Sequence, residues 1–170
     1  MKKHIISVLV ENKSGVLSRI AALFAARGFN IDSLAVGETE NPKISRMTIV
    51  SQGEENVLEQ VVKQLRRLID VISVSDYTKK GLDYVDRELV LVKVEAASSA
   101  KRSEIIEVVD IFRAKIVDVS LKALSIEITG TKDKIRAFLD LMHDFKIKEI
   151  VRTGKIAIVR ENQSNGNKNE

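Results

Sequence analysis

The apolar residues of this chain repeat one order of strand-like and helix-like segments twice. In the first half, apolar runs and period-two alternation predict strands at residues 4–10, 31–38, 44–52 and 71–76. Apolar residues at helical spacing predict one helix after the first strand and one after the third: Val16, Leu17, Ile20, Leu23 and Phe24, then Val57, Leu58, Val61, Val62, Leu65 and Leu68. This order is typical of a ferredoxin-like sandwich, in which two helices cover one face of an antiparallel sheet.

The second half shows the same order. Strands are predicted at 88–94, 116–121, 124–130 and 145–151, with a last strand at 155–161. The helices between them are marked by Ile105, Ile106, Val109 and Phe112, and by Ile135, Phe138, Leu139 and Met142. The expected fold class is therefore α+β, with two consecutive ferredoxin-like βαββαβ sandwiches whose sheets are antiparallel and carry helices on one face.

Composition shifts divide the chain into domains. The polar segment TKKGLDYVD, residues 78–86, is interpreted as a linker, so we expect a first domain at 1–78 and a second at 79–160. Residues 161–170 are almost free of apolar side chains, and we expect a disordered polar tail there.

The first helix has a clear end signal. Its apolar face runs from Gly15 to Arg27, and Gly28 follows where a left-handed residue commonly ends a helix. We expect Phe29 to pack back on Phe24, a contact that often accompanies this kind of helix end.

The first predicted sheet has apolar residues on both faces. Ile44, Met47 and Ile49 are split across the two sides of the third strand, whereas the helices cover only one side. An apolar second face favours a partner sheet or chain, so we expect a homo-oligomer.

Composition also weighs against several kinds of site. The chain has no cysteine and only two histidines, His4 and His143, which lack a metal-site or triad spacing. We therefore expect no metal ligands and no self-contained catalytic site. The net charge of +4 is well mixed along the chain, no apolar run has the length of a membrane helix, and the N-terminus lacks a signal-peptide pattern. We expect a cytoplasmic protein that binds neither membrane nor nucleic acid.

RNA recognition is the nucleic-acid alternative that this strand order raises. RNA-recognition domains stack bases on aromatic side chains of their central strands. The third strand here reads ISRMTIVS, without an aromatic residue, and aromatic residues make up 4% of the chain. The sequence disfavours that function.

The loop ENKSG before the first helix is the remaining candidate site. The first turn of that helix has no Asp or Glu, and its end offers backbone N–H groups and a partial positive charge, which suit a carboxylate. Asn12 carries an amide that can donate and accept, and Gly15 allows close approach to the backbone. From the residues alone, capping of the helix by Ser14 or Asn12 is the favoured interpretation, with ligand binding as the alternative.

Four segments carry a family resemblance that covers residues 2–160. With ENKSGVLSRI, RGFNIDSL, SRMTIV and QLRRLIDVISV, the chain resembles ACT domains, and more closely the small regulatory subunits of acetolactate synthase. DRELVLVKV and IFRAKIVDVS resemble the family's C-terminal domain.

The resemblance implies a binding site for a branched-chain amino acid, chiefly valine, at the interface of two ACT domains. Asn12 and Gly15 would hold the polar end of the effector, assisted by the amide of Val16, and Asn30 and Ile31 would come from the neighbouring chain. An acidic residue in the first helical turn would repel the effector carboxylate.

The resemblance also implies a partner. The chain would be a non-catalytic homodimer that activates a large catalytic subunit and confers feedback inhibition on branched-chain amino acid (valine and isoleucine) biosynthesis. Thiamine diphosphate, Mg and FAD would belong to that partner, and this chain would hold no cofactor. The loop EAASSAKRS in the second half lacks the Asn-x-x-Gly arrangement, so we expect that domain to contact the partner or to stabilise the dimer.

Two alternatives remain open at this point. The chain could be an ACT-type amino-acid sensor that regulates a different enzyme, which co-purification with a large thiamine enzyme would disfavour. It could also be a self-contained enzyme, for which turnover by the isolated chain would be the sign. Preference among valine, leucine and isoleucine depends on pocket volume, because one methylene changes affinity by only ~1 kcal/mol.

Overall fold

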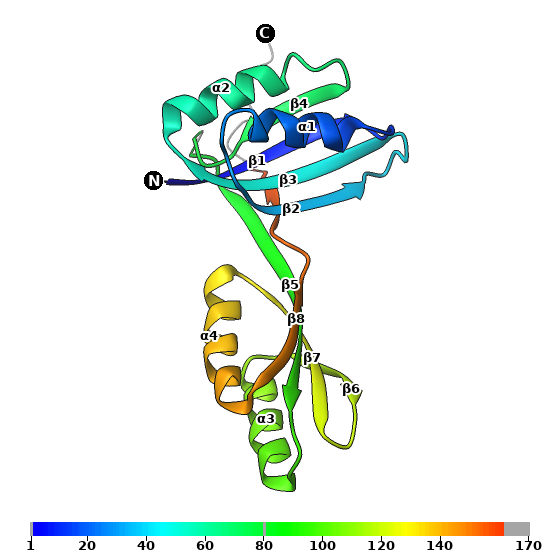
Figure 1. Cartoon of the computed structure of the whole chain (residues 1–170), viewed down its shortest axis with the longest axis vertical. Coiled ribbons are helices and arrows are strands. Elements are labelled where there is room, and N and C mark those ends of the chain that lie inside the picture. The colour runs from blue at the N-terminus through cyan, green and yellow to red at the C-terminus, as the bar shows by residue number, and fades with distance from the viewer. Residues whose placement is uncertain (1, 80, 162–170) are drawn as a thin grey trace. The chain divides into compact units, whose positions relative to one another are not determined.

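The computed structural model describes residues 2–79 and 81–161. It contains two compact units (Figure 1). The first comprises the chain up to Asp86 together with the segment from Lys155 onward, and the second runs from Arg87 to Gly154.

The first unit has the expected βαββαβ order. Its elements are β1 (Lys2–Glu11), α1 (Val16–Ala25), β2 (Ile31–Glu38), β3 (Ile44–Gly53), α2 (Glu55–Leu65) and β4 (Val71–Asp76). The strands form an antiparallel sheet in the order β2-β3-β1-β4, and both helices lie on one face of it (Figure 1). The ferredoxin-like fold is confirmed for this half.

Strand alternation places one apolar layer under the two helices. Ile6 lies opposite Ile49 and Val8 opposite Met47, so these side chains share the helix-facing side of the sheet. The helices cover them with further buried side chains, namely Val16, Ile20, Phe24, Leu58, Val61, Val62 and Leu65.

The end of α1 matches the predicted signal. Gly28 has φ +69°, a left-handed conformation that glycine adopts without steric cost. The backbone N–H of Phe29 donates to the carbonyl of Phe24 at 3.0 Å, and the Phe29 ring packs against the buried core that contains Phe24. Phe29 thus packs on the same core as Phe24, and a direct contact between the two rings stays a prediction.

The opposite face of the first sheet is covered by the chain itself. Ile5 and Val50 lie opposite each other on that face and are buried in a cluster with Tyr77 and Ala157. Leu82 and Tyr84 pack on the same cluster, and the Tyr77 and Tyr84 ring centroids are 5.9 Å apart. These segments of the same chain therefore cover Ile5 and Val50 on this face, and the expected homo-oligomer stays a prediction.

The second unit repeats the architecture. Its elements are β5 (Tyr84–Glu95), α3 (Ser99–Ile111), β6 (Lys115–Val119), β7 (Ala123–Gly130), α4 (Lys132–Met142), the 3₁₀ turn η1 (His143–Phe145) and β8 (Ile147–Arg152). The strand order is β6-β7-β5-β8, and β9 (Ile156–Val159) also pairs with β5. The core includes Val90, Val92, Ile126 and Phe138, and the expected α+β class is confirmed.

The segment predicted as a linker is partly strand. Tyr84, Val85 and Asp86 are the first residues of β5. Their polar neighbours favoured the linker interpretation. Tyr and Val nevertheless favour strands, and the alternation of side chains between the two faces continues into residues 88–94. The described residues of 79–86 and 155–160, assigned by the sequence to the second domain, group with the first unit in space.

Other boundaries differ by a few residues. The strand predicted at 145–151 begins at Ile147, because residues 143–145 form a 3₁₀ turn and Lys146 has φ +56°. The strand predicted at 116–121 is Lys115–Val119, and the last strand is Ile156–Val159. Of the tail predicted at 161–170, residues 162–170 lie outside the described part of the chain.

Phe24→Ala tests the packing of α1. Phe24 is fully buried, and removing its ring leaves a cavity, so we expect a loss of about 3–5 kcal/mol in the free energy of unfolding. Urea denaturation followed by circular dichroism measures the loss. Ser18→Ala, on the exposed side of the same helix, should change stability by less than about 1 kcal/mol, and equal losses in the two variants would contradict this assignment of the core.

Candidate functional site

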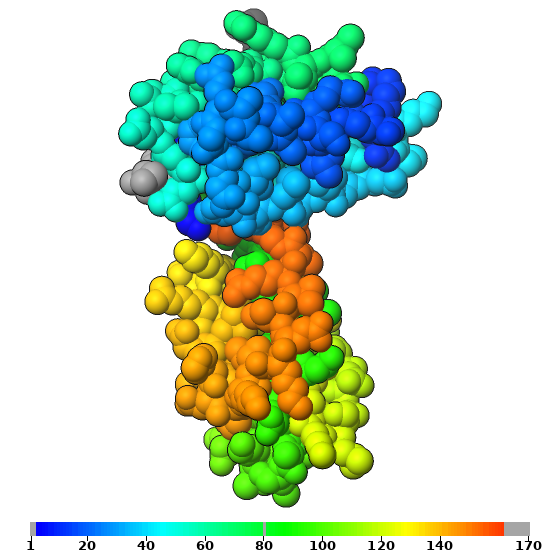
Figure 2. All heavy atoms as spheres, in the orientation of Figure 1, coloured from blue at the N-terminus to red at the C-terminus, as the bar shows by residue number. Residues whose placement is uncertain are grey.

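The loop between β1 and α1 lies at the surface of the first unit (Figure 2). Gly15 is the residue that precedes α1 and has φ +82°. Residues other than glycine adopt this left-handed conformation only with strain, Asn and Asp least so. Gly15 therefore shapes the loop and adds no side chain of its own at the helix end.

No side chain caps α1, in contrast to the helices of the second unit. Ser98 caps α3 and Thr131 caps α4, each accepting a hydrogen bond from a backbone N–H of the first turn. At α1 neither Ser14 nor Asn12 accepts such a bond from the described residues, so the capping interpretation is wrong.

The first turn of α1 has no negatively charged side chain that would repel an anion. It contains no acidic residue, whereas α2 and α4 carry Glu55 and Asp133 in their first turns. The amides of Leu17 and Ser18 have no acceptor within the described residues. A helix N-terminus in this state presents N–H donors and a partial positive charge to any carboxylate that approaches.

Asn12 is held in place by two other segments of the first unit. Its Nδ2 donates to the Glu38 carboxylate at 3.0 Å and to the Pro42 carbonyl at 2.9 Å. The backbone N–H of Asn12 donates to the Lys43 carbonyl at 2.7 Å. These bonds use both amide donors, so the side-chain oxygen is the atom left to accept a bond from a ligand.

Arg19 is a cation beside this loop that the sequence reasoning did not select. A Cβ at Gly15 would lie 3.3 Å from Arg19 Nη1. Arg19 Nη2 donates to the Asp70 carboxylate at 2.5 Å, which ties α1 to the turn before β4. Helical side chains lean toward the preceding turn, so the spacing of four residues from Gly15 was the signal that could have found Arg19.

Lys13, also in the loop, is paired with an acidic neighbour. Its Nζ lies 2.6 Å from the Glu11 carboxylate, and this hydrogen bond and charge raise the pKa of Lys13 above its ordinary value. Lys13 therefore stays protonated at neutral pH, and its charge is balanced locally by Glu11.

Asn30 and Ile31 lie away from the loop within one chain. They follow the C-terminal end of α1, whereas Asn12, Gly15 and Val16 lie at its N-terminal end. A helix of ten residues is about 15 Å long. One chain thus brings together the first three predicted residues of the site and separates them from the other two.

Neither histidine forms a metal cluster. His4 is fully buried, with Nδ1 2.7 Å from the Asp76 carboxylate, and Asp76 also accepts the backbone N–H groups of Thr78 and Lys79. Within residues 2–79 and 81–161 no three His, Cys, Asp or Glu side chains are placed to bind a metal ion. No helix in those ranges could span a membrane.

Comparisons with known proteins match both units. Residues 6–73 match the family model described as the AHAS small subunit-like ACT domain, and residues 87–161 match that of the small subunit of acetolactate synthase. The chain is 56% identical over 161 residues to a probable acetolactate synthase small subunit of Archaeoglobus fulgidus, covering 95% of this chain and 99% of that one. It is 52% identical over 170 residues to the acetolactate synthase small subunit of Aquifex aeolicus, covering all of this chain and 88% of the relative.

A solved structure supports the same relationship. The acetolactate synthase small subunit from Thermotoga maritima is 41% identical, with a TM-score of 0.85, and the match covers 95% of this chain and 99% of that one.

The first unit is thus an ACT domain, a regulatory module. The chain as a whole belongs to the family of acetolactate synthase small subunits, which confirms the resemblance seen in its sequence. These are the regulatory subunits of that enzyme.

The ion pair of Arg19 with Asp70 gives a test of how the loop is anchored. Replacing Arg19 by Met leaves the mostly buried Asp70 carboxylate without its cation, and we expect a loss of about 1 kcal/mol in unfolding free energy. Because the pair acts as a unit, Arg19→Met with Asp70→Asn should cost less than the sum of the two single changes. Additive losses in urea denaturation would show that the pair does not couple α1 to the turn.

Proposed function

We propose that this chain is the regulatory subunit of acetolactate synthase that binds a branched-chain amino acid, chiefly valine, at the loop from Asn12 to Val16. The observation that carries the proposal is the N-terminus of α1, which lacks both a capping side chain and an acidic residue. The effector carboxylate lies against these free N–H groups, close to the backbone of Gly15. The Asn12 side-chain oxygen accepts a hydrogen bond from the effector's ammonium group.

The binding site is shared by two chains. Asn30 and Ile31 of the neighbouring chain complete it, since within one chain they lie at the far end of α1. Two features support a homodimer through the ACT domain: β2 is an edge strand of the sheet, and Val36 and Leu17 expose 47% and 43% of their surface on β2 and α1. Closing two chains over one ligand makes occupancy and dimer geometry depend on each other.

The regulatory effect falls on a large catalytic subunit. That partner supplies thiamine diphosphate, Mg and FAD, and this chain supplies no cofactor. The chain activates the partner and transmits feedback inhibition when valine, or leucine or isoleucine, is bound. Micromolar affinity corresponds to a binding free energy of about 8 kcal/mol. A coupling free energy of ~1–3 kcal/mol out of this total changes the activity of the catalytic subunit several-fold or more.

Calorimetric titration of the purified chain with L-valine is the primary test. We expect saturable binding that Asn12→Ala abolishes or weakens at least tenfold, because the variant loses the acceptor for the ammonium group. Glycine as titrant controls for the side-chain pocket. If the wild-type chain binds no branched-chain amino acid, alone or with the catalytic subunit, the proposed function is wrong.

Gly15→Asp tests the position of the carboxylate. It adds a negative charge where the effector's own negative charge is to lie, so we expect the reconstituted enzyme to lose valine inhibition. Gly15→Asn is the matched control, because it has nearly the same size and the same tolerance of positive φ but no charge. Normal inhibition of the Gly15→Asp enzyme would place the site elsewhere.

Mixing two inactive variants tests whether two chains share the site. We expect Asn12→Ala and Asn30→Ala each to abolish valine binding when alone. After dissociation and random re-association, half of the dimers are mixed and each has one site with both wild-type residues, which restores about a quarter of the binding capacity. Calorimetric stoichiometry measures this capacity, and a site built from one chain would recover none.

A further inference from the structure

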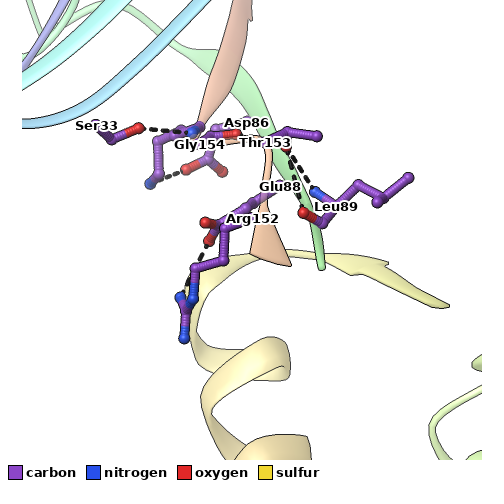
Figure 3. Close-up of polar contacts among 8 residues, drawn as sticks. Ser33, Asp86, Glu88, Leu89, Arg152, Thr153 and Gly154 are labelled. Carbon is purple, nitrogen blue, oxygen red and sulfur yellow. Dashed lines mark hydrogen bonds and ion pairs between the residues drawn. The ribbon is translucent and has the colours of Figure 1, made fainter. Parts of the chain in front are cut away.

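Two chain segments join the first unit to the second. The chain leaves the first unit after Asp86 and returns at Lys155. In the first unit the Lys155 ammonium group pairs with the Asp86 carboxylate (Figure 3), and these side chains expose only 21% and 20% of their surface. The outgoing and returning segments are thus tied together where they belong to the ACT domain.

Lys155 is also bonded to the strand that begins at the proposed effector site. Its backbone N–H donates to the Ser33 hydroxyl oxygen at 2.9 Å (Figure 3). Ser33 lies in β2 only two residues after Ile31. The register of β2 against β3 shifts between Ile31 and Ser33, so the bond is made where the β2 ladder is irregular.

The same two segments are bonded to each other within the second unit. The backbone N–H of Leu89 donates to the Thr153 hydroxyl and that of Thr153 to the Leu89 carbonyl, both at 3.1 Å (Figure 3). Arg152 Nη1 lies 3.6 Å from the Glu88 carboxylate. The pair of segments is therefore fastened at both ends, by Asp86 with Lys155 and by Leu89 with Thr153.

We propose that Ser33, Lys155 and Asp86 form the connection that transmits effector binding from the ACT domain to the second unit. This inference rests on the proposed function, because it takes β2 as the strand that the effector contacts in one chain of the pair. A ligand that holds Asn30 and Ile31 changes the position of β2 at Ser33. The bond from Ser33 is made to the main chain of Lys155, so its movement is passed directly to the returning segment and, through Asp86, to β5.

The physical basis is a difference in free energy between two arrangements of β2. Effector binding shifts the populations of the two arrangements by its differential affinity for them. The shift is passed to the returning segment through a contact that differs between the arrangements, which here is the hydrogen bond of Ser33. Removing the bond is expected to leave effector affinity almost intact and to weaken the response of the catalytic partner. A purely structural role for Ser33 would instead alter stability and binding together.

Ser33→Ala is tested in the full-length chain reconstituted with its catalytic subunit. We expect its calorimetric Kd for L-valine to stay within about twofold of wild type, and its activation of the enzyme without valine to be unchanged. The maximal inhibition by saturating valine should fall several-fold. Ser33→Thr, which keeps the hydroxyl, should restore inhibition, and Ser73→Ala, an exposed serine in β4, is the matched control.

Lys155→Met supplies an independent variant, because it keeps the backbone N–H and removes the ion pair with Asp86. We expect it to reduce maximal inhibition in the same way, and Ser33→Ala combined with Lys155→Met to be no worse than the more severe single change. Unchanged inhibition in Ser33→Ala overturns the inference, as does loss of valine binding in that variant. Absence of valine binding in the wild-type chain overturns the proposed function itself and this inference with it.

Discussion

Burial of one face of α1 against the sheet is the interaction on which the candidate site depends. Val16, Ile20 and Phe24 are almost completely buried over β1 and β3. Because this packing anchors the helix from its first residue, its N-terminus persists without a capping side chain. The helices of the second unit, where Ser98 and Thr131 serve as caps, show the usual local solution. Open N–H groups at α1 are therefore a consequence of tertiary packing.

The loop that leads to this helix is equally determined by its surroundings. Asn12 is bonded to the end of β2 through Glu38 and to the β2–β3 turn through Pro42, while Arg19 connects α1 to the turn before β4 through Asp70. The side chains of Asn12 and Arg19 are thus positioned by segments distant in the chain. Such preorganisation lowers the entropy that an effector must remove on binding.

A second consequence of the fold lies on the other face of the sheet. Tyr77, Leu82, Tyr84 and Ala157 cover Ile5 and Val50, so the segments that lead to and from the second unit are part of the structure of the ACT domain. The returning segment is bonded to β2 at Ser33. In this chain β2 is therefore hydrogen-bonded to the segment that continues covalently from the second unit.

The sequence by itself determined the order and type of the elements, the ferredoxin-like fold of both halves, and the left-handed turn at Gly28 that follows α1. Periodicity and glycine placement are local signals. It also selected Asn12, Gly15 and Val16 as neighbours, since they are adjacent in the chain. Only the tertiary structure decided that Ser14 and Asn12 do not cap α1, that Arg19 lies beside Gly15, and that Tyr84 to Asp86 belong to a strand. The pairing of Ser33 with Lys155 joins residues 122 positions apart, and no local pattern encodes such a contact, because it depends on how distant segments pack.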